Sequence, residues 1–126
     1  METIEKEMKR ELREKCRIAT IRFLKHGEGM KILDESFETD AGRCVIDVDS
    51  EGVLHFVTYG GKNSEVKVKP KPRADKRERL EEMAMAYLVV AGADLEEGGI
   101  SFDEAFITQA TSGKGLLRYR KNAHNL

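Results

Sequence analysis

The run that most constrains the fold is Val53–Tyr59, VLHFVTY, because it is the most apolar and β-prone stretch of the chain. Such a run predicts a buried strand. We expect a loop, YGGKNS, at residues 59–64, and a second β-prone pattern follows it at Glu65–Lys69. There charged and apolar residues alternate strictly as EVKVK, which predicts a half-exposed strand. Pro70 and Pro72 end that strand or keep it at the edge of a sheet.

Two segments have the apolar spacing of amphipathic helices, residues 2–26 and residues 74–90. A glycine follows each of them, which is typical of a helix C-terminus. Met83 and Met85 in the second helix are interpreted as packing residues.

Further strands are predicted at residues 30–38, 43–48, 100–108 and 115–121. Apart from the half-exposed strand at 65–69, the order along the chain is helix, three strands, helix, and then one or two strands. This order predicts an α/β fold. The length of 126 residues fits a single domain that spans residues 1–126.

Hydrophobic residues make up 40% of the chain and charged residues 36%, which is the balance of a globular protein with a heavily charged surface. No apolar run suits a signal peptide or a membrane span, so we expect a cytoplasmic protein with no membrane partner. The two cysteines lack the spacing of a metal site, and the three histidines lie far apart in the sequence.

The net charge is −1, but the charges are unevenly distributed. Residues 62–79 and 114–121 are rich in Lys and Arg, whereas residues 81–104 contain acids and neither Lys nor Arg. A basic face that binds a polyanion, DNA or RNA, is one interpretation of this distribution, and a mixed solvated surface is the other.

Several stretches resemble the uncharacterised YraN-like bacterial family. They are GRCVID followed by a turn and LHFVTYG, then DKRERLEEMAMAYL in the second predicted helix, and SFDEAFI in a late strand. The resemblance covers roughly residues 12 to 110 and rests on the order and spacing of these stretches. It implies a restriction-endonuclease-like core of the PD-(D/E)xK nuclease superfamily, in which a mixed sheet is flanked by helices.

The resemblance also implies a metal site, in which an Asp and a Glu-x-Lys bind Mg²⁺ and activate a water molecule. Asp47 keeps the family's Asp, but Val45 stands where the family has a Glu. The Glu and Lys of Glu-x-Lys fall on Thr58 and Gly60, and an early helix Glu aligns with Arg17. Only one member of the expected polar set is therefore kept, and one carboxylate alone binds Mg²⁺ weakly.

A rearranged site would recruit Glu65 and Lys67, which spell Glu-Val-Lys. Glu65 lies seven residues beyond Thr58, and its strand has the pattern of an exposed edge rather than of a buried centre. These two differences argue against the rearrangement. A hairpin that folds Glu65 back toward Asp47 would argue for it.

Two other polar features have simpler interpretations. His55 on the buried strand is interpreted as a satisfied core or half-core residue. Asp49 and Glu51 precede a glycine and are interpreted as turn residues.

The leading hypothesis is a catalytically degenerate nuclease-fold protein that needs no cofactor and binds nucleic acid through a basic face. The cations predicted to form that face are Lys62, Lys67, Lys69, Lys71, Arg73, Lys76, Arg77, Arg118, Arg120 and Lys121. One alternative is a Mg²⁺-dependent endonuclease with Asp47 as metal ligand and with Glu65 and Lys67 completing the catalytic set. The other is a protein-interaction module, for example a homodimer, that docks through the EVKVK edge.

Overall fold

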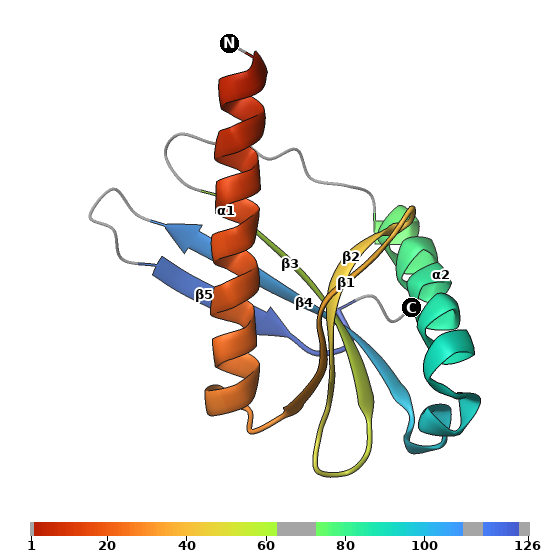
Figure 1. The fold of residues 1–126 in the computed structure, drawn as a ribbon. Coiled ribbons are helices and arrows are strands. Elements are labelled where there is room, and N and C mark those ends of the chain that lie inside the picture. The colour runs from red at the N-terminus through yellow and green to blue at the C-terminus, as the bar shows by residue number, and fades with distance from the viewer. Residues whose placement is uncertain (1, 63–72, 110–114, 124–126) are drawn as a thin grey trace.

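The computed structural model describes residues 2–62, 73–109 and 115–123. The elements follow the predicted order, and Figure 1 shows their arrangement. They are α1 (Glu2–Arg22), the π-helical turn η1 (Phe23–Gly27), β1 (Lys31–Thr39), β2 (Gly42–Val48), β3 (Leu54–Lys62), α2 (Arg73–Ala91), the 3-10 helix η2 (Ala93–Gly98), β4 (Ile100–Gln109) and β5 (Gly115–Arg120). The predicted strand at 65–69 lies outside the described residues.

The strands form one mixed sheet in the order β1-β2-β3-β4-β5. Strands β1, β2 and β3 are antiparallel neighbours, β3 and β4 are parallel, and β5 returns antiparallel to β4. The parallel pair requires a long crossover, which α2 and η2 supply between β3 and β4. The prediction of an α/β fold with a mixed sheet and two helices is confirmed.

The two helices cover opposite faces of the sheet, which we call the α1 face and the α2 face. On the α1 face, Ile21 and Leu24 pack against Val45, Val57 and Ala105 of the strands. Because side chains alternate along a strand, the intervening residues face α2. On that side the core cluster consists of Cys44, Ile46, Leu54, Phe56, Leu80, Met83, Ala84 and Phe102.

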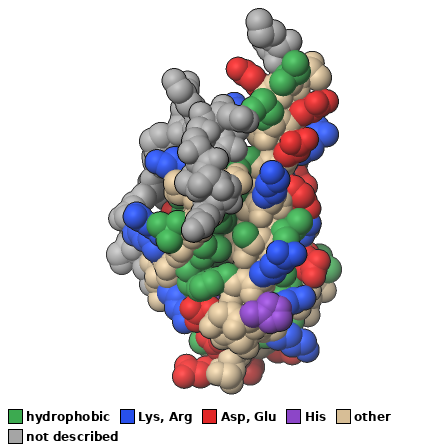
Figure 2. Space-filling model, turned by 90° about the vertical axis from the view of Figure 1, so that its left-hand side faces the viewer, with side chains coloured by type: hydrophobic (Ala, Val, Ile, Leu, Met, Phe, Trp, Pro, Cys, Tyr) green, Lys and Arg blue, Asp and Glu red, His purple; other side chains and the backbone are tan. Residues whose placement is uncertain are grey.

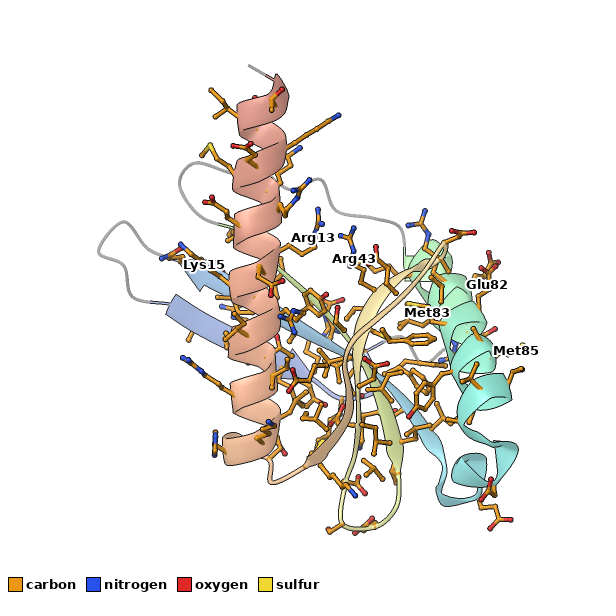
Figure 3. All side chains as sticks on the ribbon, viewed as in Figure 1. Arg13, Lys15, Arg43, Glu82, Met83 and Met85 are labelled. Carbon is orange, nitrogen blue, oxygen red and sulfur yellow. The ribbon has the colours of Figure 1, made fainter. Side chains whose placement is uncertain are left out.

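The interpretation of both methionines as packing residues is half right. Met83 is 2% exposed and points from α2 toward the sheet, whereas Met85 is 69% exposed and points away from it (Figure 3). Two residues correspond to just over half a helical turn, so both side chains cannot reach the same face.

The expected loop at residues 59–64 is wrong for its first part, because β3 continues as a strand to Lys62. Each residue of β3 is paired in register with β4, from Leu54 opposite Ile100 to Lys62 opposite Thr108. Gly61 is needed in this extension, since a Cβ there would lie 2.6 Å from Sγ of Cys16 on α1 and 2.5 Å from a β4 carbonyl oxygen. Pairing with β4 therefore overrides the low strand propensity of glycine.

A groove remains between α1 and the β4–β5 edge of the sheet. It holds about 150 Å³, and Leu12, Cys16, Ala19 and Ile107 line it. Figure 2, which views the molecule from this side, shows apolar side chains gathered beside α1. None of the residues predicted to be functional lines this groove. In the part of the chain that the structure describes, no helix is long and apolar enough to cross a membrane.

Candidate functional site

A row of polar side chains crosses the sheet on the α1 face, at the end where β2 finishes and β3 and β4 begin. Asp47 on β2 is the register partner of His55 on β3, and His55 is the partner of Ser101 on β4. Asp103 follows two residues later on β4 and therefore shares this face. All four side chains are buried, with exposed fractions of 5% or less.

His55 bridges two carboxylates. Its Nδ1 lies 2.6 Å from Oδ2 of Asp103, and its Nε2 lies 2.9 Å from Oδ2 of Asp49. Burial acts to lower the pKa of His55, but the hydrogen bonds to Asp103 and Asp49 outweigh it and raise the pKa to about 9. At neutral pH the ring is therefore an imidazolium that donates from both nitrogens.

Asp103 accepts hydrogen bonds at both carboxylate oxygens. Oδ2 accepts from His55 and from the hydroxyl of Tyr119, and Oδ1 accepts from the hydroxyl of Ser101 and from the backbone N–H of Asn122, 3.0 Å away. Burial acts to raise the pKa of Asp103, but these hydrogen bonds outweigh it and lower the pKa. Asp103 is therefore an ionised carboxylate that joins β3, β4 and β5.

Asp47 differs from its neighbours. Its side chain is fully buried, and neither carboxylate oxygen has a hydrogen-bond partner among the described residues. Burial raises the pKa of Asp47 to about 7; the positive charge of His55 opposes this shift, and Asp103 and Asp49 add to it. A buried carboxyl without partners is costly to ionise, so this group is half protonated near neutral pH.

The register between β2 and β3 decides which β3 side chains share a face of the sheet with Asp47. On β3, the side chains that share the face of Asp47 are His55, Val57 and Tyr59, because they alternate from the register partner of Asp47. Thr58 and Gly60, onto which the family's Glu and Lys fall, point to the opposite face. A Glu and a Lys at those two positions could not converge on Asp47.

The two other positions onto which the family's acids fall hold no carboxylate. Val45 is buried in the α1-face core, and Arg17 forms an ion pair with Glu14 on its own helix. Glu65 and Lys67 lie outside the described residues, as does the EVKVK edge proposed for docking. Within the described ranges, no group of three or more His, Cys, Asp or Glu side chains is arranged to hold a metal ion.

Three of the cations predicted to bind nucleic acid are engaged with acids. Lys76 lies 3.4 Å from Glu104, and Lys121 lies 3.4 Å from Glu28. Arg77 forms an ion pair with Glu81 at 2.7 Å, and its guanidinium also lies 4.7 Å from the ring centre of Phe102. These contacts reduce the charge that the three side chains can offer to a phosphate.

The other described cations form a different group. Arg118 and Arg120 are exposed on β5, and Lys62 is exposed at the end of β3. All three point to the α2 face. Their register partners on β4 are the even-numbered residues 104, 106 and 108, which alternate with Ala105 of the α1-face core. None of the three forms an ion pair with a described acidic side chain, and Glu104, the cross-strand neighbour of Arg120, is engaged by Lys76. We call this group the cation patch.

Arg73, the last of the predicted cations within the described backbone, begins α2, and its side chain is not described. Lys67, Lys69 and Lys71 lie outside the described residues.

Most of the buried polar cluster was not predicted from the sequence. His55 was predicted as a satisfied core residue, which is confirmed, and Asp49 as a turn residue, which is also confirmed, since its Oδ1 accepts from the backbone N–H groups of Glu51 and Val53. Ser101 and Asp103 gave a weak signal, as two polar residues at alternating positions in an apolar strand. The sequence did not indicate that Asp103 would bind His55 of β3 and Tyr119 of β5.

No protein-family model and no curated protein sequence matches this chain.

Proposed function

We propose that this protein is a nucleic-acid-binding domain on a restriction-endonuclease-like scaffold that lacks a working catalytic set. The observation that carries the proposal is the cation patch, in which Lys62, Arg118 and Arg120 project from one face of the sheet without acidic partners among the described residues. Arginine is well suited to phosphate recognition because its planar guanidinium can donate two parallel hydrogen bonds.

The scaffold assignment is supported by the element order and by the sheet. The resemblance to the YraN-like family implies a helix, three strands, a helix and a further strand in a mixed sheet, and the described elements follow this order.

The absence of catalysis is supported by the surroundings of Asp47. In a metal-dependent nuclease a divalent cation balances the charge of the site's carboxylates. Here the imidazolium of His55 already provides a positive charge beside Asp47 and binds Asp49 and Asp103 directly. The cation patch also lies on the opposite face of the sheet, so a strand held there is not presented to Asp47.

Binding by the cation patch would be sequence-tolerant and salt-sensitive, because contacts to phosphate carry no base code and release condensed counterions. With two or three phosphates neutralised, the slope of log K against log salt is about −2 for single strands.

The test is fluorescence anisotropy with labelled DNA and RNA at low salt, comparing wild type with the double variant Arg118→Glu and Arg120→Glu. A matched control is Lys9→Glu with Arg22→Glu, which changes the net charge equally at exposed positions of α1. We expect wild type and the control to bind similarly and the β5 variant to lose binding by at least about tenfold. Equal loss in both double variants would reduce the effect to net charge and would contradict the proposal.

The second candidate function is the Mg²⁺-dependent nuclease, and one observation favours it. Both oxygens of Asp47 are without hydrogen-bond partners among the described residues, as expected for a carboxylate whose ligand comes from solution. Calorimetry with Mg²⁺ and Mn²⁺ on wild type and Asp47→Ala tests this candidate. Metal binding that disappears in Asp47→Ala, together with metal-dependent cleavage of DNA or RNA, would establish it over the binding function.

A further inference from the structure

Phe106 occupies the centre of the surface that carries the cation patch. It lies on β4, with Gly60 of β3 as its register partner on one side and Arg118 of β5 on the other. Like the cation patch, it points to the α2 face, because it alternates with Ala105, which belongs to the α1-face core.

Phe106 is not part of the apolar core that the described residues form. The other strand aromatics on this face have packing partners: Phe37 and Phe56 each contact Tyr87 of α2 edge to face, and Phe102 packs under Arg77. Phe106 is partly exposed and belongs to none of the three core clusters. Of the described elements, α2 therefore packs over the β2–β3 side of this face, and Phe106 keeps part of its surface exposed outside that cluster.

Gly60 contributes no side chain to the surface beside the Phe106 ring. A Cβ built at this position would have no described atom within 4 Å. The glycine therefore provides open space against one side of Phe106, where any larger side chain would stand in the way.

Cations lie around the ring. Arg118 is the direct cross-strand neighbour of Phe106, at a typical Cβ–Cβ separation of about 5 Å. Arg120 belongs to the adjacent register row of β5, and antiparallel diagonal neighbours of this kind lie about 7–8 Å away. Lys62 lies on β3, two residues after Gly60, and therefore faces the same side as Phe106. The acid within this arrangement, Glu104, is engaged by Lys76.

We propose that this surface binds single-stranded nucleic acid, with a base stacked on Phe106 and the adjoining phosphates held by Arg118, Arg120 and Lys62. This inference rests on the proposed function and specifies its substrate class. An aromatic ring offers its face to any base, which gives stacking without sequence preference. A base paired within a duplex is already stacked on both faces and presents only its edges, so duplex DNA would gain nothing from Phe106.

The test compares a labelled oligothymidylate with a labelled hairpin duplex of equal length by anisotropy at one low salt concentration. We expect wild type to prefer the oligothymidylate. Phe106→Leu should weaken its binding by about tenfold, the order of the contribution of one base stacked on an aromatic ring, and leave duplex binding unchanged. Phe106→Tyr should retain the affinity because it keeps the ring.

Two further variants separate stacking from general damage to the surface. Leu116→Ala is the matched control, because Leu116 is 57% exposed on the same face of β5 and has no ring; it should bind as wild type does. Gly60→Val should weaken single-strand binding without removing the ring, because its side chain fills the bare space while suiting a strand.

The outcomes distinguish this inference from the proposed function. Equal affinity for both nucleic acids, with no effect of Phe106→Leu or Gly60→Val, would overturn the single-strand inference and leave the cation patch as a general phosphate-binding surface. Failure of wild type to bind either probe would overturn the proposed function, and the inference with it.

Discussion

The two faces of the sheet use charge in opposite ways. On the α1 face, His55, Asp49 and Asp103 form a hydrogen-bonded cluster in which His55 and Asp103 are buried. On the α2 face, Arg118 and Arg120 are exposed and have no acidic partner among the described residues. Both groups come from neighbouring strands of one sheet.

This difference in burial and pairing indicates whether a charge contributes to folding or to ligand binding. A buried, paired charge is coupled to folding, because removing one partner leaves the other desolvated and unbalanced. An exposed charge without a partner contributes little to folding and remains available to a ligand. The α1-face cluster should therefore govern stability and its pH dependence, and the cation patch should govern binding.

The largest expected effect follows from removing Asp103. Asp103→Ala leaves the His55 imidazolium without its closest carboxylate and the hydroxyls of Tyr119 and Ser101 without an acceptor. We expect a loss of about 3–5 kcal/mol in the free energy of unfolding, measured by urea denaturation at pH 7. Glu38→Ala, which removes the exposed partner of Arg43, should cost less than about 1 kcal/mol. Equal costs for the two variants would contradict the distinction between buried, paired charges and exposed ones.

The second effect is a pH dependence that His55 causes. Its pKa is raised from 6.5 to about 9 in the folded protein, so the folded state binds the proton more tightly than the unfolded chain does. The resulting stabilisation is fully present below pH 6.5 and is lost as the pH rises through about 9. We expect the free energy of unfolding to fall by about 2–3 kcal/mol across this range, measured by urea titrations at several pH values. His55→Gln should flatten this part of the profile, and an unchanged slope would refute the assignment.

A comparable loss of stability with rising pH, over a lower pH range, is expected at Asp47. Its pKa is raised from 3.8 to about 7, so the stability that its protonated form gives at low pH is lost as the pH rises between these values. Asp47→Asn removes that loss. We expect the variant to be more stable than wild type by about 3 kcal/mol at pH 8, with little difference at pH 4. Thermal unfolding at the two pH values measures it, and a variant less stable at pH 8 would show that Asp47 is ionised and satisfied.

The smallest effect should come from the cation patch. Arg118→Glu with Arg120→Glu should change the free energy of unfolding by less than about 0.5 kcal/mol, because both side chains are exposed and have no described acidic partners. The same protein should have lost its nucleic-acid binding. A large destabilisation would mean that these arginines contribute to the fold, and their role in binding would then have to be tested with Lys62 alone.

Local patterns in the sequence were enough to predict the elements. The helical spacing of apolar residues predicted α1 and α2, and the β-prone run at 53–59 predicted β3, the central strand of the sheet. These predictions succeed because periodicity reports on which side of an element is buried, and this property depends on nearby residues alone. The end of β3 was misjudged because its two glycines form a strand only when paired with β4.

The tertiary structure alone decided which residues meet. Thr58 and His55 are three positions apart on one strand, but only His55 shares the face of Asp47, because side chains alternate and the register with β2 sets the face. Likewise, Lys76 and Arg118 were both predicted from the sequence to bind nucleic acid. In the structure α2 brings Lys76 to Glu104, whereas Arg118 is exposed beside Phe106. The sequence by itself determined the order of elements and the supply of charges. Long-range strand pairing decided which charges are buried and paired and which are left for a ligand, since that choice depends on contacts between residues far apart in the chain.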